Sequence, residues 1–201
     1  MTTVTLATQS DRDTLQRLLF ERAFRYSEEP AFRLASGALS RYYLNSKLVT
    51  LDPKGATLIG RLVFERLRGL GVQAVGGLTL GADPIALATA IASEAAGEPI
   101  AAFVVRKEPK GHGTAQWIEG PLPPQAPVAV VDDVVTTGGS TEKALNVLKQ
   151  LGHPVVKVVA LVDRDEGGRE AITRRGVSFE SLFHINDFLT LWNADPSRAV
   201  L

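Results

Sequence analysis

The sequence predicts an α/β fold in which helices flank a central parallel β-sheet on both faces. Apolar runs such as VVKVVALVD at 155–163 alternate along the chain with segments of helical periodicity. Strands that are apolar throughout are usually buried on both faces of a parallel sheet. Four of the runs also end in polar or glycine-rich stretches, and ligands bind at the carboxyl ends of strands in such sheets.

The first 50 or so residues are expected to form a helix and a hairpin, and a second helix follows them. Ser10 is the expected cap of a helix that continues to about Tyr26, with acids in its first turn. Residues 31–45 contain two short strand-like pieces around the turn signal Ser36-Gly37. A second helix is expected to open at Asp52-Pro53, because Asp caps helices and Pro suits the first helical position.

From residue 72 onward, strands and helices are expected to alternate. The expected strands are 72–77, 101–106, 128–133, 155–163 and 177–183. The expected helices open at Asp83-Pro84, cover about 139–151 and 167–175, and end with a short one from about 186. We expect a single domain over 1–201, with a helix and a small hood over about 1–50 and the α/β core over about 51–201.

The composition is that of an ordinary globular protein, with 45% apolar and 22% charged residues. Its 22 basic and 22 acidic residues balance, which argues against a partner such as nucleic acid or an anionic membrane. The absence of cysteine excludes disulfides, thiolate metal sites and a cysteine nucleophile. The start lacks the features of a secretory signal and no apolar stretch approaches the length of a membrane helix, so a cytoplasmic protein is expected.

The stretch VAVVDDVVTTGGST at 128–141 joins an apolar run, two acids and a Thr/Gly/Ser loop. Backbone amides and hydroxyls at a helix N-terminus form a phosphate site, but the Gly-Lys-Ser/Thr of a nucleoside-triphosphate loop is missing. One acid here would most often be a helix cap or turn former. Two acids would repel a bare phosphate, so the ligand should also offer hydroxyls or a cation such as Mg²⁺. A phosphorylated ribose meets both requirements.

This stretch resembles the phosphoribosyl-pyrophosphate (PRPP) signature of the type I phosphoribosyltransferases. The resemblance implies the fold of that family, with the ribose hydroxyls at the two acids and the 5-phosphate at the loop. It also implies Mg²⁺ as cofactor, held mainly by PRPP and water, with Asp132 or Asp133 as the candidate protein ligands. The residues assigned to PRPP here are Asp132, Asp133, Val134, Val135, Thr136, Thr137, Gly138, Gly139 and Ser140.

The segment RKEPKGHG at 106–113 leaves a core strand and opens a polar stretch, so we expect a mobile loop over 107–124. A charged loop is often only solvated surface, whereas a long loop in a compact domain is usually a functional lid. The order of residues resembles the catalytic loop of orotate phosphoribosyltransferases, which closes over pyrophosphate, often on the partner's site in a dimer. Cations there stabilise the charge that the leaving pyrophosphate gains, and closure excludes water.

The same resemblance assigns roles to the charged residues of this loop. Its pyrophosphate contacts would be Arg106, Lys107, Lys110 and His112. Lys107, Lys110 and His112 would be catalytic together with Asp132 and Asp133, and the histidine could donate or transfer a proton.

Orotate recognition is implied at two further places. DRDEGG at 163–168 is either a plain strand-to-helix loop with a capping acid or, by the resemblance, the site where Arg164 pairs with the orotate carboxylate. The segment from Phe32 onward resembles the hood of the orotate enzymes, where an aromatic pair could close over the flat base. The residues assigned to orotate are Thr136, Arg164, Tyr42, Tyr43 and Lys47.

GGLTLGAD at 76–83 is either a flexible turn or, by the resemblance, the pyrophosphate loop. Two positions depart from the pattern, since many orotate enzymes carry Lys where this chain has Ala35 and Gly81. Lys47 is a candidate replacement for one of those charges. The departures leave the charge balance around the substrate open.

The resemblance therefore implies an orotate phosphoribosyltransferase, a pentosyltransferase of pyrimidine synthesis that makes orotidine 5-phosphate and pyrophosphate from orotate and PRPP. It also implies a homodimer in which each lid serves the neighbouring site. The alternatives are a phosphoribosyltransferase for another base and a non-catalytic regulator that senses PRPP.

Overall fold

The computed structural model describes residues 7–33, 37, 39–109 and 116–194. Its centre is a six-stranded sheet of order β10-β9-β8-β5-β6-β7, in which only the β6–β7 pair is antiparallel. The predicted parallel sheet is thus confirmed. The strands are β5 (Ala74–Leu78), β6 (Ala101–Val105), β7 (Ile118–Glu119), β8 (Val128–Val135), β9 (Val155–Asp163) and β10 (Ser178–His184).

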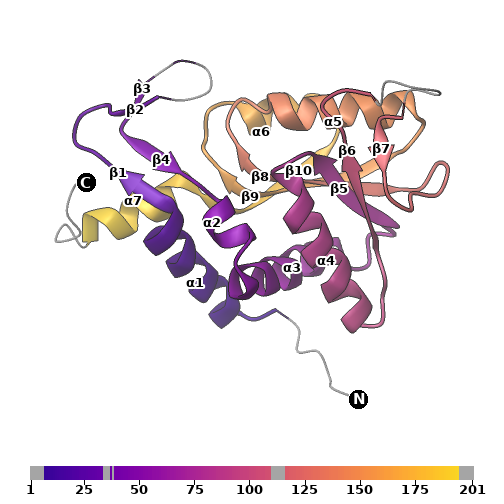
Figure 1. Ribbon diagram of the computed structural model, residues 1–201, viewed down its shortest axis with the longest axis horizontal. Helices are drawn as coiled ribbons and strands as arrows, with labels where there is room; N and C mark the ends of the chain where they lie inside the picture. Colours follow the sequence, from indigo (N-terminus) through magenta and orange to yellow (C-terminus); the bar gives the residue numbers. More distant parts are fainter. Residues whose placement is uncertain (1–6, 34–36, 38, 110–115, 195–201) are drawn as a thin grey trace.

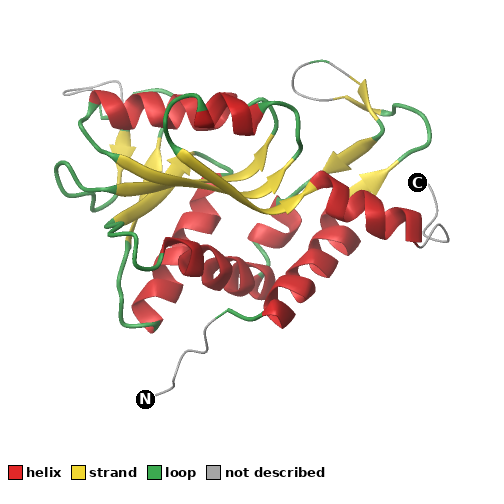
Figure 2. Ribbon diagram, turned by 180° about the vertical axis from the view of Figure 1, so that it is seen from behind, coloured by secondary structure: helices red, strands yellow, loops and turns green. Residues whose placement is uncertain are grey.

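Helices cover both faces of this sheet, as Figures 1 and 2 show. One face carries α1 (Gln9–Leu18), α3 (Pro53–Leu67) and α4 (Ala82–Ala95), and the other carries α5 (Gly139–Gln150) and α6 (Gly168–Thr173). None of the helices within the described residues combines the length and the apolar character that crossing a membrane requires.

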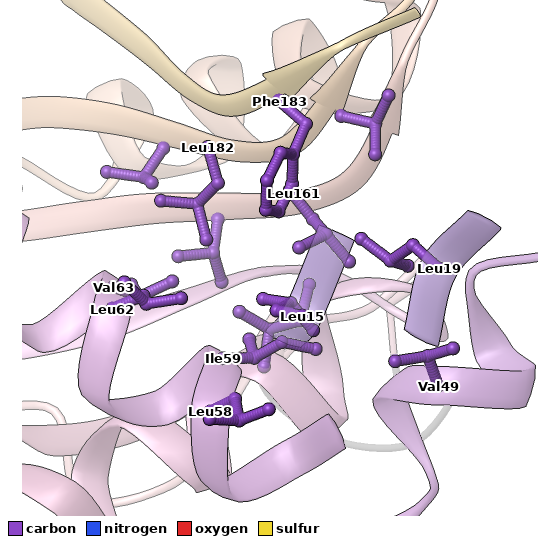
Figure 3. Close-up of a cluster of buried hydrophobic side chains, with 14 of the residues drawn as sticks. Leu15, Leu19, Val49, Leu58, Ile59, Leu62, Val63, Leu161, Leu182 and Phe183 are labelled. Atoms are coloured by element: carbon purple, nitrogen blue, oxygen red, sulfur yellow. The ribbon is translucent and has the colours of Figure 1, made fainter. Parts of the chain in front are cut away.

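The core therefore has two layers, one on each side of the sheet. Figure 3 shows part of the layer between the sheet and helices α1 and α3, where Leu15 and Ile59 meet Leu161 and Leu182 of the sheet. Parity along β8 separates the layers, because successive side chains of a strand point to opposite faces. Ala129 and Val131 belong to this layer, whereas Val128 and Val130 pack beneath α5.

The N-terminal helix differs from the prediction at both ends. Its cap is Thr8 and not Ser10, because the Thr8 Oγ1 accepts a hydrogen bond from the Asp11 N–H (3.1 Å) and the Asp11 carboxylate accepts one from the Thr8 N–H (3.0 Å). The helix also stops before Tyr26. A π-helical turn, η1 (Leu19–Ala23), leads into β1 (Phe24–Tyr26), which pairs antiparallel with β4 (Tyr42–Leu44). Partner-strand pairing decides the structure of these aromatic residues.

The predicted hairpin within 31–45 is confirmed as β2 (Phe32–Arg33) paired with β3 (Leu39–Ser40). Strands β1–β4 and the short helix α2 (Lys47–Thr50) form the hood, beside which the C-terminal helix α7 (Ile185–Ala194) lies (Figure 1). Helix α2 was not predicted. It sits directly before α3, which begins as predicted, with Asp52 accepting hydrogen bonds from the N–H groups of the first turn.

Candidate functional site

Asp132 and Asp133 lie within β8, as in the expected strand over 128–133, so their side chains leave the strand on opposite faces. Asp132 faces α5, where the Thr141 hydroxyl donates to its Oδ2 at 2.8 Å. Asp133 faces the hood, where the Ser46 hydroxyl donates to its Oδ2 at 2.5 Å. The two acids are adjacent in sequence but are held by different parts of the fold.

Asp132 is an acid with a strongly altered proton affinity. Its side chain is buried, and this burial, followed by the negative charge of Asp133, raises the pKa of Asp132 from 3.8 to about 7. The hydrogen bonds from the Thr141 hydroxyl and the Asp133 N–H oppose the rise. Asp132 is therefore partly protonated near neutral pH, and a ligand that donates hydroxyls will favour its ionised form.

Asp133 is the more heavily bonded of the two acids. Its Oδ2 also accepts from the Lys47 Nζ at 3.1 Å, and its Oδ1 accepts from the Val134 N–H at 3.0 Å. The structure thus places Lys47, which was predicted to face orotate, on the acid of the PRPP signature. Ser46 was not singled out by the sequence analysis, since a serine before a short unpredicted helix carries no signal of its own.

The Thr/Gly/Ser loop connects β8 to the first turn of α5. Gly138 precedes the helix with a φ of 87°, a conformation that glycine adopts without strain, and it offers no side-chain cap. Thr137, Gly139 and Ser140 are exposed. The first N–H groups of a helix have no intrahelical partners, so this turn offers donors to an anionic ligand; the 5-phosphate assigned to it stays a prediction.

The neighbouring β9–α6 loop packs tightly against the Thr/Gly/Ser loop. A Cβ at Gly168 would lie 2.5 Å from the carbonyl oxygen of Thr136 and 3.0 Å from the nitrogen of Gly138. Only glycine permits this approach. The loop predicted to bind phosphate and the loop predicted to bind orotate are therefore held side by side, with Thr136 at their contact.

Arg164 begins the β9–α6 loop and is buried, with 6% of its side chain exposed. Its Nη2 lies 2.8 Å from the Glu166 Oε1, and its Cζ lies 4.6 Å from the centre of the Tyr42 ring. The Tyr42 hydroxyl donates to the same Glu166 oxygen at 3.4 Å. The Arg164 Nε is buried and has no hydrogen-bond partner within the described part of the chain. The structure thus brings the predicted orotate residues Arg164 and Tyr42 together, and it adds Glu166.

The two tyrosines of the predicted aromatic pair point to different sides of β4. Tyr42 and Tyr43 are consecutive in β4 and so face opposite sides of that strand. Tyr42 lies beneath Arg164, whereas Tyr43 is exposed and stacks on Phe32 with ring centres 5.9 Å apart.

The predicted pyrophosphate loop follows β5 at the same edge of the sheet. Thr79 donates to the Asp83 Oδ2 at 2.7 Å, and the Thr79–Leu80 peptide bond is cis. A Cβ at Gly81 would lie only 2.3 Å from the Asp133 Oδ1. A lysine at this position, as in many members of the family resembled, would displace the Asp133 carboxylate. The glycine at position 81 thus lets the Asp133 carboxylate take the position it has here.

The segment predicted as a mobile loop over 107–124 includes the short strand β7, which pairs with β6. Arg106 is held at its base, with Nη1 3.2 Å from the Glu119 Oε1 and Nε donating to the Glu108 carbonyl at 3.3 Å. Lys107 is exposed. Lys110 and His112 lie outside the described residues, as do Ala35 and Ser36.

One group of three potential metal ligands occurs among the described residues, and it lies apart from the two acids of β8. The ligand atoms of Asp163, Asp165 and His184 are all within 4.8 Å of one another. The Arg169 guanidinium already pairs with Asp163, its Nε 3.2 Å from Oδ2. This cluster is thus already linked by hydrogen bonds and an ion pair, from Arg169 to Asp163 and from His184 to Asp165.

Comparison with known proteins agrees with this geometry. A family model for the phosphoribosyl transferase domain matches residues 74–185. The orotate phosphoribosyltransferase of Aquifex aeolicus is 49% identical over 179 residues, which cover 89% of this chain and 98% of the relative. The enzyme of that name from Thermosynechococcus vestitus is 49% identical over 177 residues, covering 88% of this chain and 92% of the relative.

Solved structures give the same result. The crystal structure of the Mycobacterium tuberculosis orotate phosphoribosyltransferase in complex with PRPP superposes with a TM-score of 0.74 at 36% identity, covering 89% of this chain and 98% of the other. That of the Aeropyrum pernix orotate phosphoribosyltransferase gives 0.73 at 32% identity, covering 90% and 98%. The predicted type I phosphoribosyltransferase fold is confirmed.

Proposed function

Because the chain belongs to the orotate phosphoribosyltransferase family, we propose that the carboxyl edge of its sheet binds PRPP and orotate side by side and joins them. The enzyme is a pentosyltransferase of pyrimidine synthesis. It forms the bond between N1 of orotate and C1 of the ribose and breaks the bond between C1 and the pyrophosphate oxygen. The products are orotidine 5-phosphate and pyrophosphate.

PRPP is assigned to the end of β8 and the start of α5. Asp132 and Asp133 accept the ribose hydroxyls, and the open first turn of α5, from Thr137 to Ser140, receives the 5-phosphate. This assignment is supported by the position of both features on one continuous segment. The two carboxylates suit the ribose hydroxyls, and the open helix turn that follows suits the 5-phosphate of the same ligand.

Orotate is assigned to the space beside Arg164 and Thr136. The observation that carries this assignment is the buried guanidinium, whose Nε lacks a partner while Nη2 is held by Glu166. A carboxylate that meets the Nε edge of a guanidinium makes charge-assisted hydrogen bonds, which are among the strongest in proteins. A base without a carboxylate would leave this group unsatisfied.

The departure of pyrophosphate is assigned to the cations at the end of β6 and in the lid. As the bond to C1 breaks, the ribose becomes oxocarbenium-like and the pyrophosphate gains negative charge. Arg106 and Lys107, with Lys110 and His112 further along the lid, would stabilise that charge on closure, and closure would keep water from the donor. Arg106 is already oriented by Glu119.

Magnesium would be held mainly by PRPP and water, with Asp132 or Asp133 as the candidate protein ligands. Asp133 is paired with Lys47, and Asp132 is partly protonated near neutral pH, so neither acid offers a full, unpaired negative charge to the ion. Mg²⁺ commonly keeps several waters and binds substrate phosphates, which fits this donor set. When bound, the ion neutralises pyrophosphate charge.

The assembly is proposed to be a homodimer. Helix α4 exposes two large apolar side chains, Leu87 (58%) and Ile91 (63%), and Leu51 beside α2 is 67% exposed. A groove between α3 and α4 on this side is lined largely by alanines and Ile91. A second copy of the chain would cover this surface and bring its lid to the neighbouring site.

The cytoplasm remains the expected location.

The test is an assay of orotate consumption in the presence of PRPP and Mg²⁺, followed by the loss of orotate absorbance. We expect turnover with orotate and none with uracil or a purine base. Turnover with another base alone would overturn the assignment of the substrate. An absence of turnover with every base, with PRPP binding retained, would favour a regulator.

A further inference from the structure

We infer that Ser46 and Lys47 of the hood are positioning residues for Asp133, which they orient and neutralise so that PRPP can bind. The inference rests on the proposed assignment of Asp133 to the ribose of PRPP. It moves Lys47 from the orotate side of the site to the PRPP side and assigns a function to Ser46.

The first observation is that both donors meet the same oxygen. The Ser46 Oγ lies 2.5 Å and the Lys47 Nζ 3.1 Å from the Asp133 Oδ2. The Val134 N–H holds the other oxygen, Oδ1, at 3.0 Å. A carboxylate offers about four acceptor positions, so three donors fix its plane and leave about one position free, on Oδ1.

Asp132 provides the other positions that can accept hydrogen bonds from the ribose. It accepts one hydrogen bond from Thr141 (2.8 Å) and one from the Asp133 N–H (3.0 Å). The two carboxylates together therefore keep only a few free positions, enough for the two ribose hydroxyls. Which lone pairs remain available is decided in part by the hood.

The second observation is that Ser46 and the helix α2 that follows it are packed into the core. Ser46 is 1% exposed, and Val49 and Thr50 of α2 are 0% and 1% exposed. Val49 belongs to the buried cluster of Leu15 and Leu19, which Figure 3 shows beneath the sheet. A Cβ at Gly55 of α3 would lie 2.1 Å from the Val49 carbonyl oxygen, so α2 is seated against α3 at a distance that only glycine allows.

The third observation concerns charge. PRPP is a polyanion, and a bare Asp133 beside it would repel it. Within the described part of the chain, Lys47 supplies the one ion pair to either acid of β8. Position 81 is a glycine and supplies no cation, and a Cβ there would lie 2.3 Å from the Asp133 Oδ1, so a longer side chain would shift that carboxylate. Lys47 therefore provides from the hood the charge that Gly81 does not provide.

The experiment measures PRPP and orotate separately. Equilibrium binding of PRPP with Mg²⁺, together with the two KM values, is compared for the wild type, Lys47→Met, Lys47→Arg and Ser46→Ala. The matched control is Lys54→Met, which removes an exposed lysine from the nearby first turn of α3. The change would leave Asp133 without its cation beside a polyanion, and because Lys47 is half exposed we expect Lys47→Met to weaken PRPP binding about fivefold.

The pattern among variants separates positioning from structural support. Lys47→Arg should recover most of the PRPP affinity, Ser46→Ala should lose part of it, and Lys54→Met should match the wild type. The KM for orotate should stay within about twofold and the melting temperature of Lys47→Met should be unchanged, because Lys47 is half exposed and pairs at the surface of the site.

Three results would overturn the inference. Unchanged PRPP affinity in Lys47→Met would make the ion pair incidental. A raised KM for orotate with normal PRPP binding would return Lys47 to the orotate side, leaving the proposed function intact. A wild-type enzyme that neither binds PRPP nor consumes orotate would overturn the proposed function and, with it, this inference.

Discussion

The guanidinium of Arg164 lies over the ring of Tyr42, with its Cζ 4.6 Å from the ring centre. The two residues come from different parts of the fold, Arg164 from the end of β9 and Tyr42 from β4 of the hood. The tyrosine ring also stacks with that of Phe24, with ring centres 6.4 Å apart. The hood thus holds the cation that is assigned to the orotate carboxylate.

The first prediction concerns this contact. A cation over an aromatic ring contributes roughly 0.5–2 kcal/mol, with the larger values at desolvated sites. Because Arg164 is buried, we expect Tyr42→Leu to raise the KM for orotate about 5- to 30-fold, and Tyr42→Phe, which keeps the ring, to stay within about threefold. Tyr43→Leu, on the other side of the strand, is the control. An equal effect of Tyr42→Leu on the KM for PRPP would contradict the assignment.

The second prediction concerns Glu166, the one acid within ion-pair distance of Arg164 among the described residues. Glu166→Gln would leave a buried cation without a counter-charge, which destabilises a protein substantially. We expect a lower melting temperature without ligand and a larger rise on adding orotate, because the substrate carboxylate would then replace the missing charge. Thermal melts with and without orotate measure this. A rise no larger than that of the wild type would show that orotate does not meet Arg164.

The third prediction concerns Gly81. Its φ of −65° is compatible with alanine, so the backbone does not oppose Gly81→Ala. The new Cβ would nevertheless lie 2.3 Å from the Asp133 Oδ1 and 2.7 Å from its Cγ. Overpacking of this kind costs about 1–3 kcal/mol, and we expect the KM for PRPP to rise about tenfold while the KM for orotate changes little. Unaltered kinetics would mean that Asp133 can move without loss.

Many of the strands and helices could be predicted from the sequence, because apolar runs and helix caps are signals carried by neighbouring residues. The bounds of β9 and the Asp52-Pro53 start of α3 were predicted from apolar runs and capping chemistry, and the structure confirms them. β1 escaped prediction because its pairing with β4 is tertiary, and the helical periodicity of the preceding residues continues into it.

The residues of the candidate site could be named from the sequence, but their hydrogen-bond and ion-pair partners could not. The resemblance named Asp133, Arg164 and Tyr42, and the structure places Tyr42 beside Arg164. The partner Ser46 was not foreseen, because a hydrogen bond that spans 87 residues, from Ser46 to Asp133, leaves no spacing to detect. Glu166 lies two residues from Arg164, but its ion pair with Arg164 could not be told from the spacing alone. The expected strand over 128–133 already included both acids, and alternation along it implies their opposite orientation; only its continuation over Val134 and Val135 was not predicted.

The fourth prediction concerns the lid. We expect Lys110→Ala to lower turnover strongly without changing the melting temperature, because the lysine is assigned to the departing pyrophosphate and not to the core. Mixing this variant with Asp133→Asn tests whether lids act across a dimer. Regained activity in the mixed sample is expected, since one site would then hold an intact acid pair and a partner's intact lid. Activity no higher than that of the separate variants would place each lid over its own site.

The fifth prediction concerns the proton on Asp132. Burial, and then the charge of Asp133, raise the pKa of this carboxyl to about 7, against 3.8 for the ordinary group. Between these pH values the folded chain keeps a proton that the unfolded chain has lost. The free energy of unfolding should therefore fall as the pH rises from about 4 to about 7, and the contribution should be constant outside this window.

Asp132→Asn removes this titration and provides the reference. We expect the free energy of unfolding of the wild type, relative to Asp132→Asn, to decrease by up to about 4 kcal/mol across the window, measured by urea unfolding at a series of pH values. The Thr141 hydrogen bond lowers the pKa, so Thr141→Val should extend the fall to higher pH. Parallel profiles of the wild type and Asp132→Asn would show that Asp132 is ionised throughout, and PRPP would then meet two full negative charges at the end of β8.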